Sequence, residues 1–444
     1  MWRYDFISVL AEAFLAGDSD ALQIAERAAH MLGRNWRWLR PLAKRYVEAF
    51  GRGTRPRHRD VVEFLLNDDG FSRAWTKYSR ELQVVQYLIE PQQMQPVAAS
   101  AGWQIPAIES VGALADWLEL SPAELDWFAD LKSFTSRKAS QQLRHYRYRV
   151  LLKKSGSIRL IEAPKPRLKE MQRRILTAIL DPIPLHPAVH GFRRGHSIKT
   201  FVAPHTGQRV VLRMDLQDFF PSIIGPRVQA FFRTAGYPEC VADLLGGICS
   251  NAAPHDVWKG ARWKFDVPLD PRLLHDARAL YSRPHLPQGA PSSPALANLC
   301  TYRVDCRLAG LAQSAGARYT RYADDLAFSG GEDFDRSVER FSTHVAAILH
   351  EEGFAVHHRK TRVMRQGVCQ RLAGLVANQR VNVPRADFDR LKATLTNCIR
   401  TGIESQNRDG RPSFRAHLEG RIAFVEMIHP GRGARLRALF DRIP

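Results

Sequence analysis

Cysteine is scarce in this sequence, and its spacing argues against the usual roles of paired thiols. The chain has 444 residues and six cysteines. No two of them are separated by only two residues, the spacing typical of zinc sites and redox disulfides. The sequence therefore predicts reduced thiols, with neither a zinc site nor a disulfide framework.

Long apolar runs are also missing. No stretch is long enough to span the hydrocarbon core of a bilayer. The chain starts Met-Trp-Arg-Tyr-Asp, and acidic residues are scattered through its first turns, unlike a secretory signal peptide. We therefore expect a cytoplasmic protein with no membrane partner.

Acidic residues are too few to balance the basic ones. The chain carries 65 Lys and Arg against 45 Asp and Glu, a formal net charge of +20. Such an excess favours a polyanionic partner, because binding phosphates releases condensed counterions. A GC-rich genome, which favours arginine codons, is the alternative explanation. Charge thus indicates a nucleic-acid partner without establishing one.

The pattern of apolar residues divides the chain into four parts. Residues 1–90 have helical periodicity, and 91–144 form a connector followed by a small helical unit. Residues 145–380 mix strands with helices. The last part, 381–444, is helical again. This organisation predicts an α+β fold.

The N-terminal part contains arginines interleaved with tryptophan. The stretches are Arg34 to Arg40 and Arg52 to Arg59. Arginine beside tryptophan suits phosphate contact combined with base stacking. A solvated helix face with its tryptophans buried beneath fits the same pattern equally well.

Several short strands are predicted in the mixed part. The first two form a hairpin with a basic tip at Lys153 to Gly156. Another strand ends at Asp215, and two more flank Ala323-Asp324-Asp325. The predicted strands cover 146–152, 157–161, 210–214, 318–322 and 326–329.

Three carboxylates carry the chemistry in this pattern. Asp324 and Asp325 lie at an apolar strand-turn-strand, and Asp215 ends a separate apolar strand. Adjacent carboxylates there are costly unless a cation compensates them. Carboxylates from two strand ends can hold two divalent cations for in-line phosphoryl transfer, and Mg²⁺ prefers such oxygen ligands. Taken alone, Asp-Asp is more often a simple turn.

Other candidates surround these carboxylates in the sequence. The segment Leu286 to Pro294 offers small residues for close backbone approach and Gln288 for hydrogen bonds. Arg159 and Lys165 supply the cations that a triphosphate needs. Lys360 is placed to protonate a leaving pyrophosphate, although a solvent-exposed lysine has the same sequence signature.

The order of these blocks resembles the fingers and palm of reverse transcriptases. The similarity covers about residues 145–380, with a thumb-like helical tail beyond, and it implies a right-hand polymerase preceded by an all-α extension. It implies that Asp215, Asp324 and Asp325 bind two Mg²⁺ ions, for which Mn²⁺ can substitute. The resemblance further assigns dNTP contacts to four residues, with Phe220 as the gate that rejects a ribose 2′-OH: Arg159, Lys165, Phe220 and Gln288.

Within that family the sequence is most similar to the bacterial retron enzymes. The blocks that carry this similarity are His190-Gly191-Phe192, Gly195-His196-Ser197-Ile198, 215–223, 370–378 and 420–425 with His429-Pro430. The family's Asn-Ala-x-x-His appears here as Phe201 to His205, and its Val-Thr-Gly as Leu372-Ala373-Gly374. Compared with the shortest retron enzymes, the chain has a long N-terminal extension and an insertion at about 251–283. The resemblance implies RNA contacts by His205, Arg193 and Arg194.

A retron enzyme copies part of a structured non-coding RNA into single-stranded DNA (msDNA), starting from an RNA 2′-OH. The implied partners are that RNA, its DNA product, dNTPs and a retron effector protein, in anti-phage defence. Two alternatives stay open. One is another bacterial reverse transcriptase, either defence-associated or related to group II introns, although no Cys/His endonuclease region is recognisable. The other is a catalytically silent RNA-binding scaffold, which the three retained carboxylates disfavour.

Overall fold

The computed structural model describes residues 3–443 except 18, 52–55, 87–93, 95, 138–139, 154–156 and 260–269. Most of the predicted hairpin tip, half of the Arg52 to Arg59 stretch, and Arg262, Trp263 and Lys264 of the insertion lie outside the described residues. The contacts divide the chain into two compact units. One comprises Met1–Pro184 with Phe220–Cys300, and the other Leu185–Phe219 with Thr301–Pro444.

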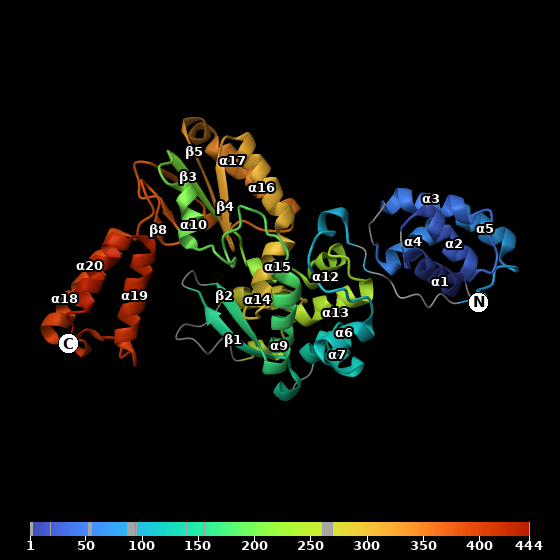
Figure 1. Cartoon of the computed structure of the whole chain (residues 1–444), viewed down its shortest axis with the longest axis horizontal. Coiled ribbons are helices and arrows are strands. Elements are labelled where there is room, and N and C mark those ends of the chain that lie inside the picture. Colours follow the sequence, from blue (N-terminus) through green and yellow to red (C-terminus); the bar gives the residue numbers. More distant parts are fainter. Residues whose placement is uncertain are drawn as a thin grey trace. The chain divides into compact units, whose positions relative to one another are not determined.

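The N-terminal residues of the first unit form a group of helices with its own apolar core (Figure 1). The helices are α1 (Arg3–Leu15), α2 (Ala21–Met31), α3 (Leu39–Phe50), α4 (His58–Asn67) and α5 (Asp69–Tyr78). Trp36 is only 7% exposed, and Trp38 packs against the same core. The Arg34 guanidinium lies 4.5 Å from the Trp36 ring. This packing fits the interpretation in which the tryptophans lie beneath a solvated face.

The rest of the first unit consists of short helices and one hairpin. Ser121 and Glu124 form a capping box at the start of α7. The basic helix α9 continues into the π-helical turn η3. The elements are η1 (Ala98–Ser100), α6 (Val111–Leu118), α7 (Pro122–Ala129), α8 (Phe134–Arg137), η2 (Gln141–Leu143), α9 (Pro166–Ile175), η3 (Leu176–Leu180), α12 (Gly225–Thr234), α13 (Glu239–Cys249), η5 (His255–Trp258), α14 (Pro271–Tyr281) and α15 (Ser293–Cys300).

The predicted hairpin is present. Strands β1 (Tyr146–Leu152) and β2 (Ile158–Pro164) pair antiparallel over their whole length. One face of the hairpin packs on an apolar cluster that includes Trp258, just before the undescribed part of the insertion. The alternation of side chains along β1 leaves Arg147 and Arg149 exposed. The hairpin therefore has one apolar and one basic face.

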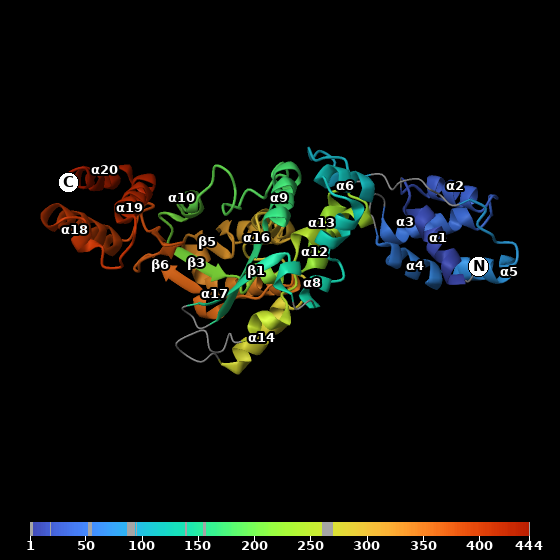
Figure 2. The ribbon, with the colours of Figure 1, turned by 90° about the horizontal axis from the view of Figure 1, so that it is seen from below.

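A four-stranded antiparallel sheet forms the centre of the second unit, in the order β4-β5-β3-β6. Figure 2 labels β5, β3 and β6 of this sheet. Its strands are β3 (Val210–Asp215), β4 (Arg318–Tyr322), β5 (Asp325–Gly330) and β6 (Arg362–Arg365). Helices α16 (Tyr302–Ser314) and α17 (Glu332–Glu351) pack on it, with the Phe328 and Phe341 ring centroids 5.1 Å apart. Phe201, from α10 (Ile198–Val202), belongs to a separate core cluster that includes Val211 and Ala327 of the sheet.

The second unit ends in three helices that share this latter core. They are α18 (Arg385–Thr401), α19 (Phe414–Ile428) and α20 (Pro430–Phe440), and Figure 1 shows them in red. Leu391 and Leu395, one turn apart on α18, are buried. The shorter elements of this unit are η4 (Ala203–His205), η7 (His358–Lys360), β7 (Arg371–Leu372), β8 (Leu375–Val376) and η8 (Glu404–Gln406). Helix α11 (Phe219–Ser222) begins at the last residue of a segment of this unit and continues in the first unit.

Helices and antiparallel sheets in one chain match the predicted α+β class. Within the described ranges, every helix is too short or too polar to cross a membrane.

Candidate active site

Two of the predicted carboxylates face each other across adjacent strands of the central sheet. Asp215, the last residue of β3, pairs in register with Asp325, the first residue of β5. Asp324 precedes it in the turn from β4. Ala323, the residue before Asp324, has a φ of +54°. A Cβ atom added at Gly191 would lie 2.6 Å from the backbone nitrogen of Ala323. Glycine at 191 thus lets the His-Gly-Phe segment approach the catalytic turn closely.

Basic side chains contact two of these carboxylates. Lys360 donates from Nζ to the two oxygens of Asp215 at 2.9 and 3.1 Å. Arg213 donates from Nε and Nη2 to one oxygen of Asp325 at 2.8 and 2.6 Å. The structure therefore brings together all four predicted catalytic residues and adds Arg213, which the sequence reasoning missed. Its position two residues before Asp215, on the same face of β3, was the available signal.

The environment of the carboxylates opposes their negative charge. Burial and the neighbouring Asp215 raise the pKa of Asp324. Burial also raises the pKa of Asp325, and Arg213 offsets this only in part. Carboxylates in this position gain most from a cation that contacts more than one of them. Their charge requirement and their oxygen donors fit a divalent metal ion.

Among the described residues, no three His, Cys, Asp or Glu side chains are arranged as a ready metal site. Lys360 is ion-paired with Asp215, so a divalent cation held by that carboxylate would have to share it with the ammonium or displace it. The carboxylate oxygens of Asp215, Asp324 and Asp325 are donors of the kind that Mg²⁺ prefers.

A fully buried ion pair supports the turn that carries Asp324. Arg321 of β4 donates two hydrogen bonds of 2.7 Å to Asp305 of α16, and neither side chain is exposed. The Tyr319 hydroxyl donates to the same carboxylate at 2.8 Å. Arg321 also donates to the carbonyl oxygen of Ala323 at 3.2 Å. Sequence reasoning missed this pair, although an arginine inside a short aromatic strand was its signal.

His205 lies in the interior, against β4 and β5, the two paired strands joined by the turn that contains Asp324. The Thr320 hydroxyl donates to the Phe201 carbonyl at 3.0 Å, so it accepts from Nε2 of His205 at 2.7 Å. Nδ1 then accepts from the Ser329 hydroxyl at 2.7 Å. Burial lowers the pKa of His205 to about 3, so the ring is neutral. The prediction that His205 contacts RNA is corrected: with no exposed surface, it joins β4 to β5.

Replacing His205 by phenylalanine is expected to lower the free energy of unfolding by about 1–3 kcal/mol, because the buried hydroxyls of Thr320 and Ser329 lose a partner. RNA affinity should stay unchanged. Urea denaturation and filter binding to RNA measure the two quantities. A fall in RNA affinity with unchanged stability would restore the original prediction.

Arg193 and Arg194, the other predicted RNA contacts, lie in the loop before α10. Arg193 donates to the Val189 carbonyl at 3.2 Å and is partly exposed. Arg194 is exposed. Their RNA contacts stay predictions.

The predicted dNTP-binding residues all belong to the first unit. Arg159 is exposed on β2, and Lys165 follows that strand with Nζ 2.9 Å from the Gln142 carbonyl. The Gln288 carbonyl accepts from the Glu162 nitrogen of β2 at 2.9 Å. Phe220 is partly exposed in α11. The structure thus places the Gln288 loop directly against the hairpin.

A family model described as reverse transcriptase (RNA-dependent DNA polymerase) matches residues 151–384. This match covers more than half of the chain. The chain belongs to the reverse transcriptase family. The matched region of this reverse transcriptase contains Asp215, Asp324, Asp325 and Lys360, together with the four residues predicted to bind dNTP. Enzymes of the family generally use divalent metal ions, in agreement with the carboxylate donor set.

Individual relatives show which members of the reverse transcriptase family this chain resembles. It is 40% identical to the retron Mx65 reverse transcriptase of Myxococcus xanthus over 307 residues, 69% of this chain and 66% of that protein. It is 36% identical to the retron Mx162 reverse transcriptase of the same organism, over 73% of this chain and 65% of that one. The retron Ec86 reverse transcriptase of Escherichia coli is 30% identical, over 67% of this chain and 82% of its own length.

The chain thus spans slightly less than two thirds of the two Myxococcus relatives. Its similarity to several retron enzymes confirms the predicted membership of the bacterial retron reverse transcriptases.

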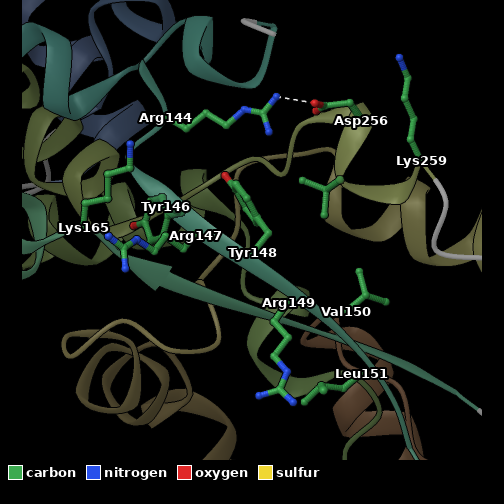
Figure 3. A pocket seen from close by; sticks show the side chains of 11 residues that line it. Arg144, Tyr146, Arg147, Tyr148, Arg149, Val150, Leu151, Lys165, Asp256 and Lys259 are labelled. Carbon is green, nitrogen blue, oxygen red and sulfur yellow. Dashed lines mark hydrogen bonds and ion pairs between the residues drawn. The ribbon is translucent and has the colours of Figure 1, made fainter. Parts of the chain in front are cut away.

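A basic pocket in this reverse transcriptase runs along β1 (Figure 3). Its volume is about 790 Å³. Arg144 contributes to it while paired with Asp256 at 2.6 Å. The other cations of its lining are Arg147, Arg149, Lys165 and Lys259. So many cations beside the rings of Tyr146 and Tyr148 suit a phosphate-bearing ligand. Arg147 and Arg149 are therefore candidate binding residues that the sequence reasoning left without a role.

Proposed function

We propose that the chain is a retron-type RNA-directed DNA polymerase that copies a structured non-coding RNA into msDNA from an RNA 2′-OH, in anti-phage defence. The observation that carries the proposal is the set of three carboxylates at adjacent strand ends, inside the region matched by the reverse transcriptase model. Partners of the same proposal are the cognate RNA, its DNA product, dNTPs and an effector protein.

The proposal includes a right-hand architecture. The central sheet with α16 and α17 serves as the palm, the β1–β2 hairpin with α9 as part of the fingers, and α18 to α20 as the thumb. The corresponding bounds are 145–380 for fingers and palm, with an insertion at about 251–283, and 381–444 for the thumb. Residues 1–90 form a helical extension, joined through the unit at 91–144.

In this proposal Asp215, Asp324 and Asp325 hold two Mg²⁺ ions, with Mn²⁺ as a substitute. When bound, the ions supply activation of the attacking hydroxyl and neutralise charge on the leaving pyrophosphate. Arg213 forms an ion pair with Asp325, which partly neutralises the carboxylate charge and fixes the orientation of the side chain. Lys360, whose ammonium lies beside Asp215, is the proton donor for the leaving group.

The nucleotide side of the proposal rests on the first unit. Arg159 and Lys165 bind the triphosphate, and Gln288 contacts the nucleotide from its loop. The Phe220 ring excludes a ribose 2′-OH by its bulk. RNA contacts come from Arg193 and Arg194, and the basic pocket along β1 supports binding of phosphate-bearing ligands generally.

Replacing Phe220 by alanine is expected to raise incorporation of ribonucleotides relative to deoxyribonucleotides by about 10- to 100-fold, since the ring's bulk is what excludes the hydroxyl. Competing rNTP and dNTP in primer extension gives the ratio of kcat/KM values. The neighbouring Phe219→Ala variant is the matched control, because Phe219 is a buried core residue. An unchanged ratio in Phe220→Ala removes the gate role.

The whole proposal is tested by producing the protein with the non-coding RNA encoded beside its gene and sequencing the nucleic acid that copurifies. The expected product is single-stranded DNA joined covalently to RNA through a 2′-OH. RNA binding without turnover should weaken steeply with salt. If purified protein, that RNA, Mg²⁺ and dNTPs yield no DNA, the proposed activity fails.

A further inference from the structure

Glu162 of β2 is a carboxylate in the interior of the first unit. Its side chain has no exposed surface, yet both of its oxygens have partners. Asn251 donates from Nδ2 to Oε1 at 2.8 Å. The second oxygen lies 2.9 Å from Nε2 of His285, which is also fully buried. A buried charge persists only when it is paired and hydrogen-bonded in this way.

The surroundings of His285 determine its protonation. Nδ1 lies 2.7 Å from the carbonyl oxygen of Arg283, which only accepts hydrogen bonds. Nε2 faces the Glu162 carboxylate, which also only accepts when it is ionised. Both ring nitrogens therefore carry hydrogen, and His285 is an imidazolium paired with a carboxylate. Burial alone lowers the His285 pKa, but the Glu162 charge and hydrogen bond outweigh it, so the pKa is raised.

This ion pair lies where segments that carry the proposed dNTP-binding residues meet. Glu162 follows Arg159 by three residues and precedes Lys165 by three, while His285 precedes Gln288 by three. The Glu162 nitrogen donates to the Gln288 carbonyl at 2.9 Å.

The Gln288 loop is also tied to β2 at the next residue. Gly289 has a φ of +139°, and a Cβ there would lie 2.8 Å from the Glu162 carbonyl oxygen. Any larger residue would push the loop off the strand.

The loop is further connected to the chain that follows Phe220. The Leu286 nitrogen donates to the Ile223 carbonyl at 3.0 Å, and the Ile223 nitrogen donates to the Phe220 carbonyl at 3.1 Å. His285 and Asn251 exchange two backbone hydrogen bonds of 2.9 and 3.0 Å. Displacing His285 would therefore shift the Gln288 loop relative to both β2 and the Phe220 helix.

We propose that Glu162 and His285 form a buried positioning pair that holds the Gln288 loop against β2 and so sets the affinity for the incoming dNTP. The inference deepens the proposed function and rests on it. Neither residue touches the nucleotide in this role. Their effect therefore falls on the KM for dNTP and much less on kcat at saturating dNTP.

The charge of the pair gives a pH signature. The groups that face His285 are Glu162 from β2, Arg283 from its own segment, and the Tyr281 ring of α14, 5.2 Å away. Tyr148 of β1 reaches the pair through Asn251, and burial, the main cause, keeps its phenol neutral at ordinary pH. Because the His285 pKa is raised, the ion pair is complete below about pH 6.5 and is lost as the pH rises through the raised value. The KM for dNTP should therefore rise at alkaline pH.

The experiment measures KM and kcat for dNTP on a primed RNA template from about pH 6.5 to about pH 9. Three variants of the full chain are compared with the unaltered protein. His285→Ala should raise KM at least about tenfold with kcat changed less than about threefold. Glu162→Gln keeps the geometry, because its amide donates to a neutral Nε2 and accepts from Asn251. It should keep KM near the original value and lose the alkaline rise.

Asp68→Asn is the matched control for a general loss of stability. Asp68 is buried and paired with Arg45 at 2.7 Å within the N-terminal helices. This variant should leave the KM for dNTP unchanged at every pH. An alkaline rise in Glu162→Gln equal to that of the unaltered protein overturns the proposal, as does an unchanged KM in His285→Ala. Both results leave the polymerase function standing, whereas an unaltered protein that makes no DNA removes the function and the inference together.

Discussion

Replacing both Asp324 and Asp325 by asparagine is expected to reduce DNA synthesis by about 1000-fold or more. Asparagine keeps the shape of the side chain but removes the charge that a divalent cation requires, and the transition state loses its electrostatic stabilisation. Single-turnover primer extension on RNA with Mg²⁺ measures the effect, because it reports the chemical step without product release.

The same change is expected to stabilise the metal-free protein. The pKa values of both carboxyls are raised, chiefly by burial, so the folded state opposes their ionisation. For an acid with a raised pKa, stability falls as the pH rises from about 3.9 through the folded value, and this loss is present at neutral pH. Asparagine does not ionise, so the double variant avoids this loss of stability. A melting temperature equal to or above that of the unaltered protein in EDTA would separate lost chemistry from misfolding.

Asp218→Asn is the matched control for these carboxylates. Asp218 lies three residues after Asp215 and has a φ of +46°, a conformation that asparagine also tolerates. Its loss should leave primer extension within about threefold of the unaltered rate. Equal activity of the Asp324→Asn/Asp325→Asn protein and the unaltered protein would remove these carboxylates from the mechanism.

Replacing Arg321 by methionine is expected to lower the free energy of unfolding by about 3–5 kcal/mol, because Asp305 is left as an unpaired buried charge. The Arg321 pKa is raised: burial lowers it, but the Asp305 charge and hydrogen bonds outweigh that effect. Adding Asp305→Leu should recover most of the stability, since an apolar pair of similar volume avoids the desolvation cost. Guanidinium denaturation measures both changes.

Activity should not recover with stability in the Arg321→Met/Asp305→Leu protein. The hydrogen bond from Arg321 to the Ala323 carbonyl is lost, and the turn that carries Asp324 is held less firmly. Arg336→Met is the matched control, because Arg336 pairs with Glu332 and both side chains are exposed, and exposed pairs contribute about 0–1 kcal/mol. If the Arg321→Met protein were as stable as this control, the buried pair would not be needed for stability.

Local patterns identified several strands in advance. The pattern in 146–152 and 157–161 predicted the β1–β2 hairpin, and the apolar run 210–214 predicted β3 with Asp215 at its end. The capping box of Ser121 and Glu124 is a local signal of the same kind, and α7 starts there. These features depend on residues close together in the chain, so local conformational preferences decide them.

Asp324 and Asp325 could also be identified from the sequence. Asp324 and Asp325 were identifiable because a strand-turn-strand pattern surrounds them and because their order with Asp215 and the Gln288 loop resembles a known family. Sequence alone determined the α+β class and the family.

The tertiary structure decided what holds these residues in place. Lys360 and Asp215 are 145 positions apart, and His205 and Ser329 are 124 apart. Neither contact has a local signature, because any exposed lysine or interior histidine gives the same pattern. The resemblance of the Phe201 to His205 block to the family's motif implied an RNA contact for His205, and the burial of this side chain corrects that prediction.

The sequence by itself therefore determined which residues are candidates for catalysis and which segments carry them, because hydrophobic periodicity and capping act over a few residues. Only the tertiary structure decided the pairs Arg321–Asp305 and Glu162–His285. Their charges are tolerable only when folding places a distant partner within hydrogen-bond distance and removes both groups from water.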